Sequence, residues 1–86
     1  MSFFVYILLC DDGSFYTGYT KNLNRRIKMH INGKGAKYTK SHKPKKVVFV
    51  EVFNTRSEAL IQERKIKKKT HKQKQELINN NNYTPN

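Results

Sequence analysis

The feature that most constrains the fold is one uninterrupted apolar run near the N-terminus, FFVYILLC at residues 3–10. A run this short, rich in aromatic, β-branched and aliphatic residues, is typical of a strand buried in a sheet. It ends at a polar turn, and residues 15–19, FYTGY, again have the composition of a strand. The sequence therefore predicts that the chain begins with a β-hairpin.

The length of the hairpin loop decides which side chains share a face of the sheet. A two-residue loop would place Tyr6 and Tyr16 on opposite faces. A three-residue loop at 11–13 suits Gly13, because the last residue of a type I turn with a bulge is left-handed. We expect this longer loop, which pairs Tyr6 with Gly18 and puts both tyrosines on one face.

Capping signals divide the rest of the chain into helices and one more strand. The predicted elements are a helix at 23–32 capped by Asn22, a strand at 47–53, a helix from the Thr55 and Glu58 pair to about Lys68, and a helix from the Thr70 and Gln73 pair to about Ile78. The strand at 47–53, VVFVEVF, is apolar enough to be covered on part of both faces.

The expected fold class is therefore α+β. It is a small three-stranded antiparallel sheet flanked by about three helices, in the order ββαβαα. A chain of 86 residues has room for a single domain, which we assign to residues 1–78. Residues 79–86 form an Asn-rich tail that we expect to be disordered.

Eighteen Lys and Arg against six Asp and Glu give a formal charge of +12. Much of this charge lies in two segments without acids, residues 33–46 and 64–74. One such run is often only a solvated surface, but two in so short a chain favour a face that binds nucleic acid, with DNA expected over RNA. The lysines that we assign to phosphate contacts are Lys34, Lys37, Lys40, Lys43, Lys45, Lys67 and Lys68.

Compartment and membrane signals are weak. The single cysteine, Cys10, has no partner for an internal disulfide and is read as a small buried apolar residue. The opening apolar run lacks the flanking signals of a secretory peptide and is too short to span a bilayer. We expect a cytoplasmic protein without membrane contact.

The predicted helix at 23–32 carries polar residues next to its apolar stripe. That stripe consists of Leu23, Ile27 and Ile31. His30 falls inside it and Arg26 at its edge, whereas Arg25 points to solvent. His30 could be a hydrogen-bonded core residue or a functional one, and Arg26 could pack its stem on the core or bind phosphate.

Glu63 raises the same question on the helix that follows residue 55. The buried face of that helix is defined by Ala59, Leu60 and Ile66. Glu63 lies among them, and an inward carboxylate is costly unless it is paired or binds a cation. The alternatives are an ion pair with Lys67, one turn later, and an oxygen ligand for a single Mg²⁺ or Mn²⁺ ion.

These motifs together resemble the GIY-YIG nuclease domain, in particular its small stand-alone bacterial members. The matching segments are FVY at 4–6, YTG at 16–18, NLNRRIKMH at 22–30 and the glutamate of SEALIQERKIKK. The resemblance covers about residues 3–69. Phe4 and Val5 replace Gly and Ile of the first triplet, and Thr17 replaces the second Ile.

The resemblance implies a role for each candidate site residue. Tyr16 would activate or orient the attacking water, and Tyr6 would form hydrogen bonds in the same cluster. Arg26 would hold the scissile phosphate, and His30 would transfer a proton or position its neighbours. Glu63 would hold the single Mg²⁺ or Mn²⁺ ion.

Two departures from the family pattern leave questions open. Tyr19 stands where some relatives carry a lysine near the metal-bound water, so the general base is not identified. The DNA-recognition module usually attached to this domain is also missing, so low sequence specificity, structure-selective recognition or delivery by a partner protein is expected. The lysine-rich segments would then supply phosphate contacts that carry little sequence information.

Three functions follow from these observations. The first is a metal-dependent endonuclease that hydrolyses DNA with low sequence specificity, with structure-selective action in repair or recombination as one option. The second is a non-catalytic nucleic-acid-binding module that keeps the GIY-YIG fold, and the third is a basic adaptor for a repair or ribosomal partner. A monomer or a weak dimer is compatible with all three.

Overall fold

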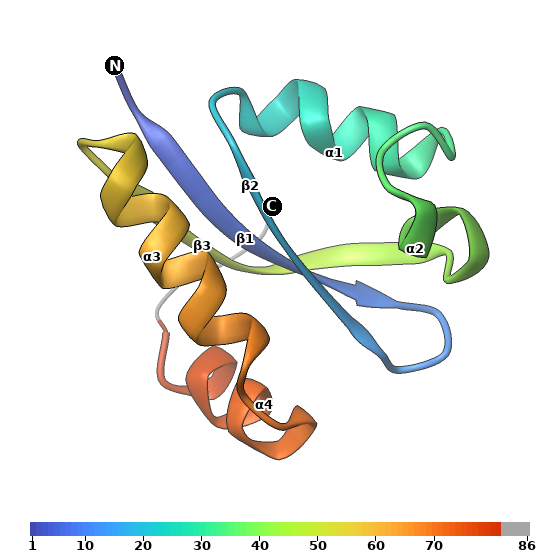
Figure 1. The fold of residues 1–86 in the computed structure, drawn as a ribbon. Coiled ribbons are helices and arrows are strands. Elements are labelled where there is room, and N and C mark those ends of the chain that lie inside the picture. Colours follow the sequence, from blue (N-terminus) through green and yellow to red (C-terminus); the bar gives the residue numbers. More distant parts are fainter. Residues whose placement is uncertain (82–86) are drawn as a thin grey trace.

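The computed structural model describes residues 1–81 (Figure 1). Its elements are β1 (Phe3–Cys10), β2 (Phe15–Thr20), α1 (Leu23–Ile31), α2 (Lys37–Ser41), β3 (Pro44–Phe53), α3 (Arg56–Lys67) and α4 (His71–Asn79). The predicted α+β class and element order are confirmed, with the short helix α2 added between α1 and β3. No helix in the described part of the chain is both long and apolar enough to cross a membrane.

The three strands form an antiparallel sheet in the order β2-β1-β3. The apolar run of β1 is central, and every residue in it except Phe4 and Leu9 is buried. β3 lies at an edge and is partly covered on both faces, since Phe49 is buried and the neighbouring Val50 is half-buried. The long N-terminal run is thus the strand around which the sheet is built.

The hairpin between β1 and β2 has the expected three-residue loop. The Gly13 N–H donates to the Cys10 carbonyl at 2.9 Å, and Gly13 has a φ of +85°, in the left-handed region that glycine adopts without strain. Tyr6 pairs with Gly18 as predicted. Tyr6 and Tyr16 therefore point to the same face of the sheet.

Helices cover both faces of the sheet (Figure 1). On one face, Val5 and Ile7 of β1 pack in a core with Ala59 and Ile66 of α3. Tyr6 points to the opposite face, because side chains alternate along a strand, and there it contacts His30 of α1. The two tyrosines thus lie on the α1 side, away from the main apolar core.

α1 begins where predicted, since the Asn22 side chain accepts a hydrogen bond from the Arg25 backbone N–H at 3.1 Å. The predicted apolar stripe is wrong at its last position. Ile31 is 63% exposed, whereas His30 is 1% exposed and is the buried residue of the helix. The last turn of α1 therefore packs on the sheet with the polar side chain of His30. Hydrogen bonds to the imidazole ring satisfy its two nitrogens there.

The two C-terminal helices also start at their predicted caps. Thr55 accepts from the Glu58 N–H at 3.2 Å, and its hydroxyl donates to the Glu58 carboxylate at 2.9 Å. Thr70 and Gln73 form a reciprocal capping box, with distances of 3.1 and 2.9 Å. α4 ends at Asn79, one residue beyond the predicted end. Of the predicted tail, residues 82–86 lie outside the described residues.

Candidate active site

Tyr6 is the centre of a buried polar cluster between β1 and α1. Its side chain is 1% exposed, and its hydroxyl lies 2.7 Å from Nε2 of His30. Gly18, its cross-strand neighbour, leaves the space that the phenol ring occupies, because a Cβ on Gly18 would overlap that ring and its hydroxyl. The glycine of the YTG triplet is therefore required by packing against Tyr6.

The second nitrogen of His30 bonds to α2. Nδ1 lies 2.8 Å from the Thr39 hydroxyl, which itself donates to the Ala36 carbonyl at 3.1 Å. Since the Thr39 proton is used there, we infer that Nδ1 carries the imidazole proton and Nε2 accepts from Tyr6. Gly35 completes the cradle, because a Cβ at that position would overlap the imidazole.

Burial keeps this cluster neutral. Desolvation raises the pKa of Tyr6 well above its ordinary value, an effect reinforced by Tyr16 and Glu63 and opposed by Arg26. Desolvation also lowers the pKa of His30, and the Arg26 charge lowers it further. Both groups are thus buried and hydrogen-bonded, which suits them to positioning neighbours and leaves them out of contact with solvent.

Tyr16 differs from Tyr6 in having a free hydroxyl. It is half-buried, and its ring packs 5.1 Å from the His30 ring and 6.4 Å from that of Tyr6, measured between centroids. Within residues 1–81 its hydroxyl forms no hydrogen bond. Of the two predicted tyrosines, Tyr16 is therefore the one available to a water or a substrate.

An aromatic stack from α2 holds the outer side of Tyr16, and sequence reasoning missed it. Tyr38 stacks on Tyr16 at 5.9 Å and on His42 at 4.0 Å. His42 Nδ1 in turn lies 2.7 Å from the Asp12 carboxylate in the hairpin turn. Strong hydrogen bonds from Ser14 and His42 also hold the pKa of Asp12 well below its usual range.

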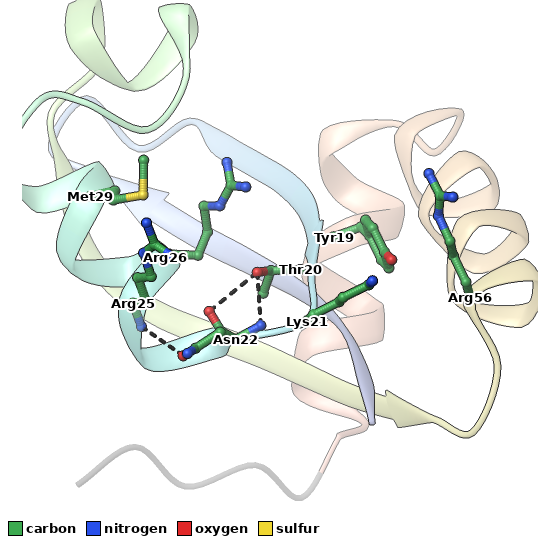
Figure 2. Close-up of a pocket in the computed structure, with 8 residues that line it drawn as sticks. All are labelled: Tyr19, Thr20, Lys21, Asn22, Arg25, Arg26, Met29 and Arg56. Carbon is green, nitrogen blue, oxygen red and sulfur yellow. Dashed lines mark hydrogen bonds between the residues drawn. The ribbon is translucent and has the colours of Figure 1, made fainter. Parts of the chain in front are cut away.

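Arg26 lies one turn before His30 on α1 and is half-buried. It lines an open cavity of about 550 Å³ together with Lys21, Arg25 and Arg56. Figure 2 shows Arg25 and Arg26 projecting from α1 on one side of the cavity and Arg56 from α3 on the other. The assignment of Arg25 to solvent alone is therefore incomplete, because this exposed residue also borders the cavity.

Lys21 and Arg56 were not among the predicted site residues. The available signal was the helical spacing on α3, where Arg56 and Glu63 are two turns apart and share one face. That spacing indicates a shared site only when α1 and α3 are known to lie on the two sides of β2.

Glu63 sits on α3 with a side chain only 16% exposed, as its place between Ala59 and Ile66 predicts. One of its oxygens, Oε2, lies 3.3 Å from Nζ of Lys67. Its charge also makes a small contribution to the raised pKa of Tyr6. Of the two alternatives for Glu63, the structure shows the ion pair with Lys67.

The donor set near Glu63 suits one type of metal ion. No group of three or more His, Cys, Asp or Glu side chains able to hold a metal occurs within residues 1–81. A Zn²⁺ site of protein ligands alone therefore finds no support there. Mg²⁺, by contrast, is usually held by one or two carboxylates with waters and substrate phosphates, and Glu63 fits that pattern.

The lysines predicted to contact phosphate are Lys34, Lys37, Lys40, Lys43, Lys45, Lys67 and Lys68, and all are exposed. Each of their two segments contacts the hairpin loop. The Lys43 carbonyl accepts from the Asp11 N–H at 2.8 Å, and His71 Nε2 lies 2.9 Å from the Gly13 carbonyl. Both basic segments are therefore anchored at the same loop.

The candidate active site thus consists of Tyr6 and Tyr16 from the three-stranded sheet in contact with His30 of α1, with Arg26 on the same helix and Glu63 on α3. Residues 2–76 match the GIY-YIG catalytic domain. The chain therefore belongs to the GIY-YIG family of nucleases, which act on nucleic acids.

Its relatives are small bacterial proteins of similar length. The chain is 53% identical over 75 residues to a UPF0213 protein of Staphylococcus epidermidis, covering 87% of this chain and 92% of the relative. It is 51% identical over 77 residues to a UPF0213 protein of Staphylococcus aureus, with 90% and 94% covered. These names state no specific activity.

Two solution NMR structures are similar in both fold and sequence. The UPF0213 protein from Bacillus halodurans superimposes with a TM-score of 0.61 at 44% identity, over 92% of this chain and 84% of the other. A protein from E. faecalis gives a TM-score of 0.65 at 40% identity, over 100% and 95%. The domain is thus shared across these bacterial proteins.

Proposed function

We propose that this protein is a metal-dependent endonuclease that hydrolyses phosphodiester bonds in DNA with low sequence specificity. The observation that carries the proposal is the Tyr16 hydroxyl, which forms no hydrogen bond within residues 1–81. Its ring packs on a buried, hydrogen-bonded support, Tyr6 and His30, while Arg26 lies one turn before His30 on α1 and Glu63 is half-buried on α3.

Each residue has a distinct role in this proposal. Tyr16 orients the attacking water and accepts its proton, directly or through a second water. Arg26 binds the scissile phosphate and offsets the charge that develops in the transition state. Tyr6 and His30 are positioning residues, because neither reaches solvent.

Glu63 would hold one Mg²⁺ or Mn²⁺ ion, displacing the ammonium of Lys67 from its carboxylate. The bound ion would supply Lewis-acid neutralisation of phosphate charge. Binding can be measured apart from activity, by the paramagnetic broadening that Mn²⁺ causes in NMR signals. Broadening centred on α3 that is lost in Glu63→Gln and kept in Glu76→Gln, an exposed acid of α4, supports the site.

Plasmid cleavage tests the activity. Supercoiled DNA with Mg²⁺ is incubated with the wild-type protein and with Tyr16→Phe, Arg26→Gln and Glu63→Gln. We expect the rate to fall about 100-fold or more in Arg26→Gln, the scale seen when a transition-state donor is removed. Arg64→Gln, an exposed arginine of α3 outside the site, is the matched control and should keep the wild-type rate.

Two outcomes would count against the proposal. Cleavage that survives both Arg26→Gln and Glu63→Gln would place the activity elsewhere. Wild-type protein that binds but fails to cut duplex, flap, junction and single-stranded substrates would favour the non-catalytic binding module. The same panel tests structure-selectivity, and a pull-down after nuclease treatment tests a partner protein.

A further inference from the structure

The chain's arginines are distributed unevenly with respect to its lysines. Fourteen of the eighteen cationic residues are lysines and only four are arginines. Three of the four arginines, Arg25, Arg26 and Arg56, line one cavity between α1 and α3, and Lys21 is the one lysine in its lining. Arginine is the residue type suited to phosphate, because its planar fork donates two parallel hydrogen bonds to phosphate oxygens.

The charge of this cavity is not offset within the described residues. No carboxylate is among its lining residues, and none of its four cations forms an ion pair in residues 1–81. Packing like charges around one cavity opposes folding unless an anion offsets them. Arg25 and Arg56 come from different helices, so their proximity is a product of the tertiary fold.

Tyr19 supplies an independent observation at the same place. Its side chain lines the cavity and is stacked on Phe3 at 6.4 Å with an interplanar angle of 9°. Its hydroxyl is buried and has no hydrogen-bond partner in the described residues. A buried hydroxyl without a partner is costly, and a phosphate oxygen in the cavity would accept its hydrogen bond.

We propose that Lys21, Arg25, Arg56 and Tyr19 form a second, non-catalytic phosphate site. It binds the backbone phosphate next to the scissile one, and Arg26 borders both positions. This placement rests on the proposed function, which assigns Arg26 to the scissile phosphate. The cavity of about 550 Å³ lies within the usual range for ligand sites, about 300–1,000 Å³, and has room for a nucleotide unit. The bound strand would then follow β2 toward α1.

Salt-dependent binding tests the site without requiring cleavage. A short fluorescein-labelled DNA duplex is titrated with protein that carries Glu63→Gln together with Lys21→Gln and Arg56→Gln. Binding is followed by fluorescence anisotropy. The matched control carries Lys65→Gln and Lys72→Gln instead, which removes the same charge. Lys65 lies on the face of α3 opposite Arg56, and both control lysines are exposed.

We expect the plot of log Kd against log salt concentration to lose about 0.9 of slope in the cavity variant, because the site binds one phosphate. The control should retain most of its slope. Equal losses in both variants would overturn the site, because they would show a response to net charge alone. Absence of cleavage, by contrast, would contradict the proposed function and leave this comparison unaffected.

A second measurement uses inorganic pyrophosphate as a small probe carrying two phosphates. Binding is followed at the side-chain Nε–H NMR signals of the four arginines, and Arg64 serves as an internal control outside the cavity. We expect Arg25, Arg26 and Arg56 to shift and Arg64 to stay in place, with weaker binding in Tyr19→Phe. Shifts of equal size at Arg64, or none at Arg56, would refute the assignment.

Discussion

At the scale of single residues, the distinctive position is His30. A histidine next to an apolar stripe can be structural or catalytic, and the structure shows a ring whose two nitrogens are already bonded, to Tyr6 and Thr39. Such a ring cannot also bind substrate. The resemblance alone left proton transfer open for this residue, whereas its burial favours positioning of Tyr6 and, through ring packing, of Tyr16.

His30 should make stability depend on pH. Burial lowers its pKa below the ordinary value of 6.5, so between these two values the unfolded chain binds the proton and the folded protein does not. The stabilising contribution of neutral His30 is therefore complete above about pH 6.5 and is lost progressively as the pH falls from that value to the lower pKa of the folded protein. Urea unfolding from pH 8 to 5 should show this decline.

The control for this experiment is His30→Asn, which cannot gain a proton. Its free energy of unfolding should be lower at pH 8 and should decline less between pH 7 and 5. His42 and His71 are the same in both proteins, so any contribution from them cancels. An equal decline in the two proteins would show that another group governs the pH dependence.

At the scale of elements, the main difference from the sequence-based prediction is the short helix α2. The sequence did not predict this helix, and it contacts the candidate site. Segment 33–46 reads as a basic loop, because a helix of five residues is too short to show periodicity. α2 nevertheless supplies Thr39 to His30 and Tyr38 to Tyr16. α2 therefore supports the candidate active site, and the helix also carries lysines.

Replacing Thr39 with Val tests this support. Thr39 is 2% exposed, and valine keeps its shape but removes the oxygen that accepts from His30. We expect a loss of about 1–3 kcal/mol in the free energy of unfolding, the cost of leaving a buried donor unpaired. Thr39→Ser, which retains the hydroxyl, should lose less. If valine is tolerated as well as serine in urea titrations, the His30 to α2 bond contributes little.

At the scale of the whole molecule, the main feature is uncompensated positive charge. The chain has a formal charge of +12, and the ion pairs within residues 1–81 are His42 with Asp12 and Lys67 with Glu63. Self-repulsion on this scale opposes the compact state. The folded protein is therefore expected to gain stability from anything that screens or binds its cations.

Thermal unfolding at different ionic strengths checks this expectation. Raising NaCl from about 10 mM to about 300 mM shortens the screening length from roughly 30 Å to below 10 Å. We expect Tm to rise by about 4 °C or more, since 1 kcal/mol shifts Tm by about 4–8 °C in a domain of this size. An uncharged osmolyte at equal osmolality is the control. An unchanged or lower Tm in salt would contradict the argument.

Local chemistry in the sequence was sufficient for the elements and for the hairpin register. Gly13 sets the loop, Asn22 and Thr70 start their helices, and β1 is apolar throughout, because turns and caps depend on residues within a few positions of one another. The resemblance then singled out Tyr16 and the other site candidates by their order along the chain.

Only the tertiary structure decided how those residues meet. It buried His30 in place of Ile31, added α2 and its aromatic stack, and brought Arg56 to the cavity of Arg26. These contacts join residues many positions apart, and their geometry depends on how the helices pack against the sheet. Sequence periodicity describes each helix face separately. It placed Arg26 at the edge of the apolar stripe of its helix and Glu63 on the buried face of another. It could not predict the cationic cavity that residues of α1 and α3 line together.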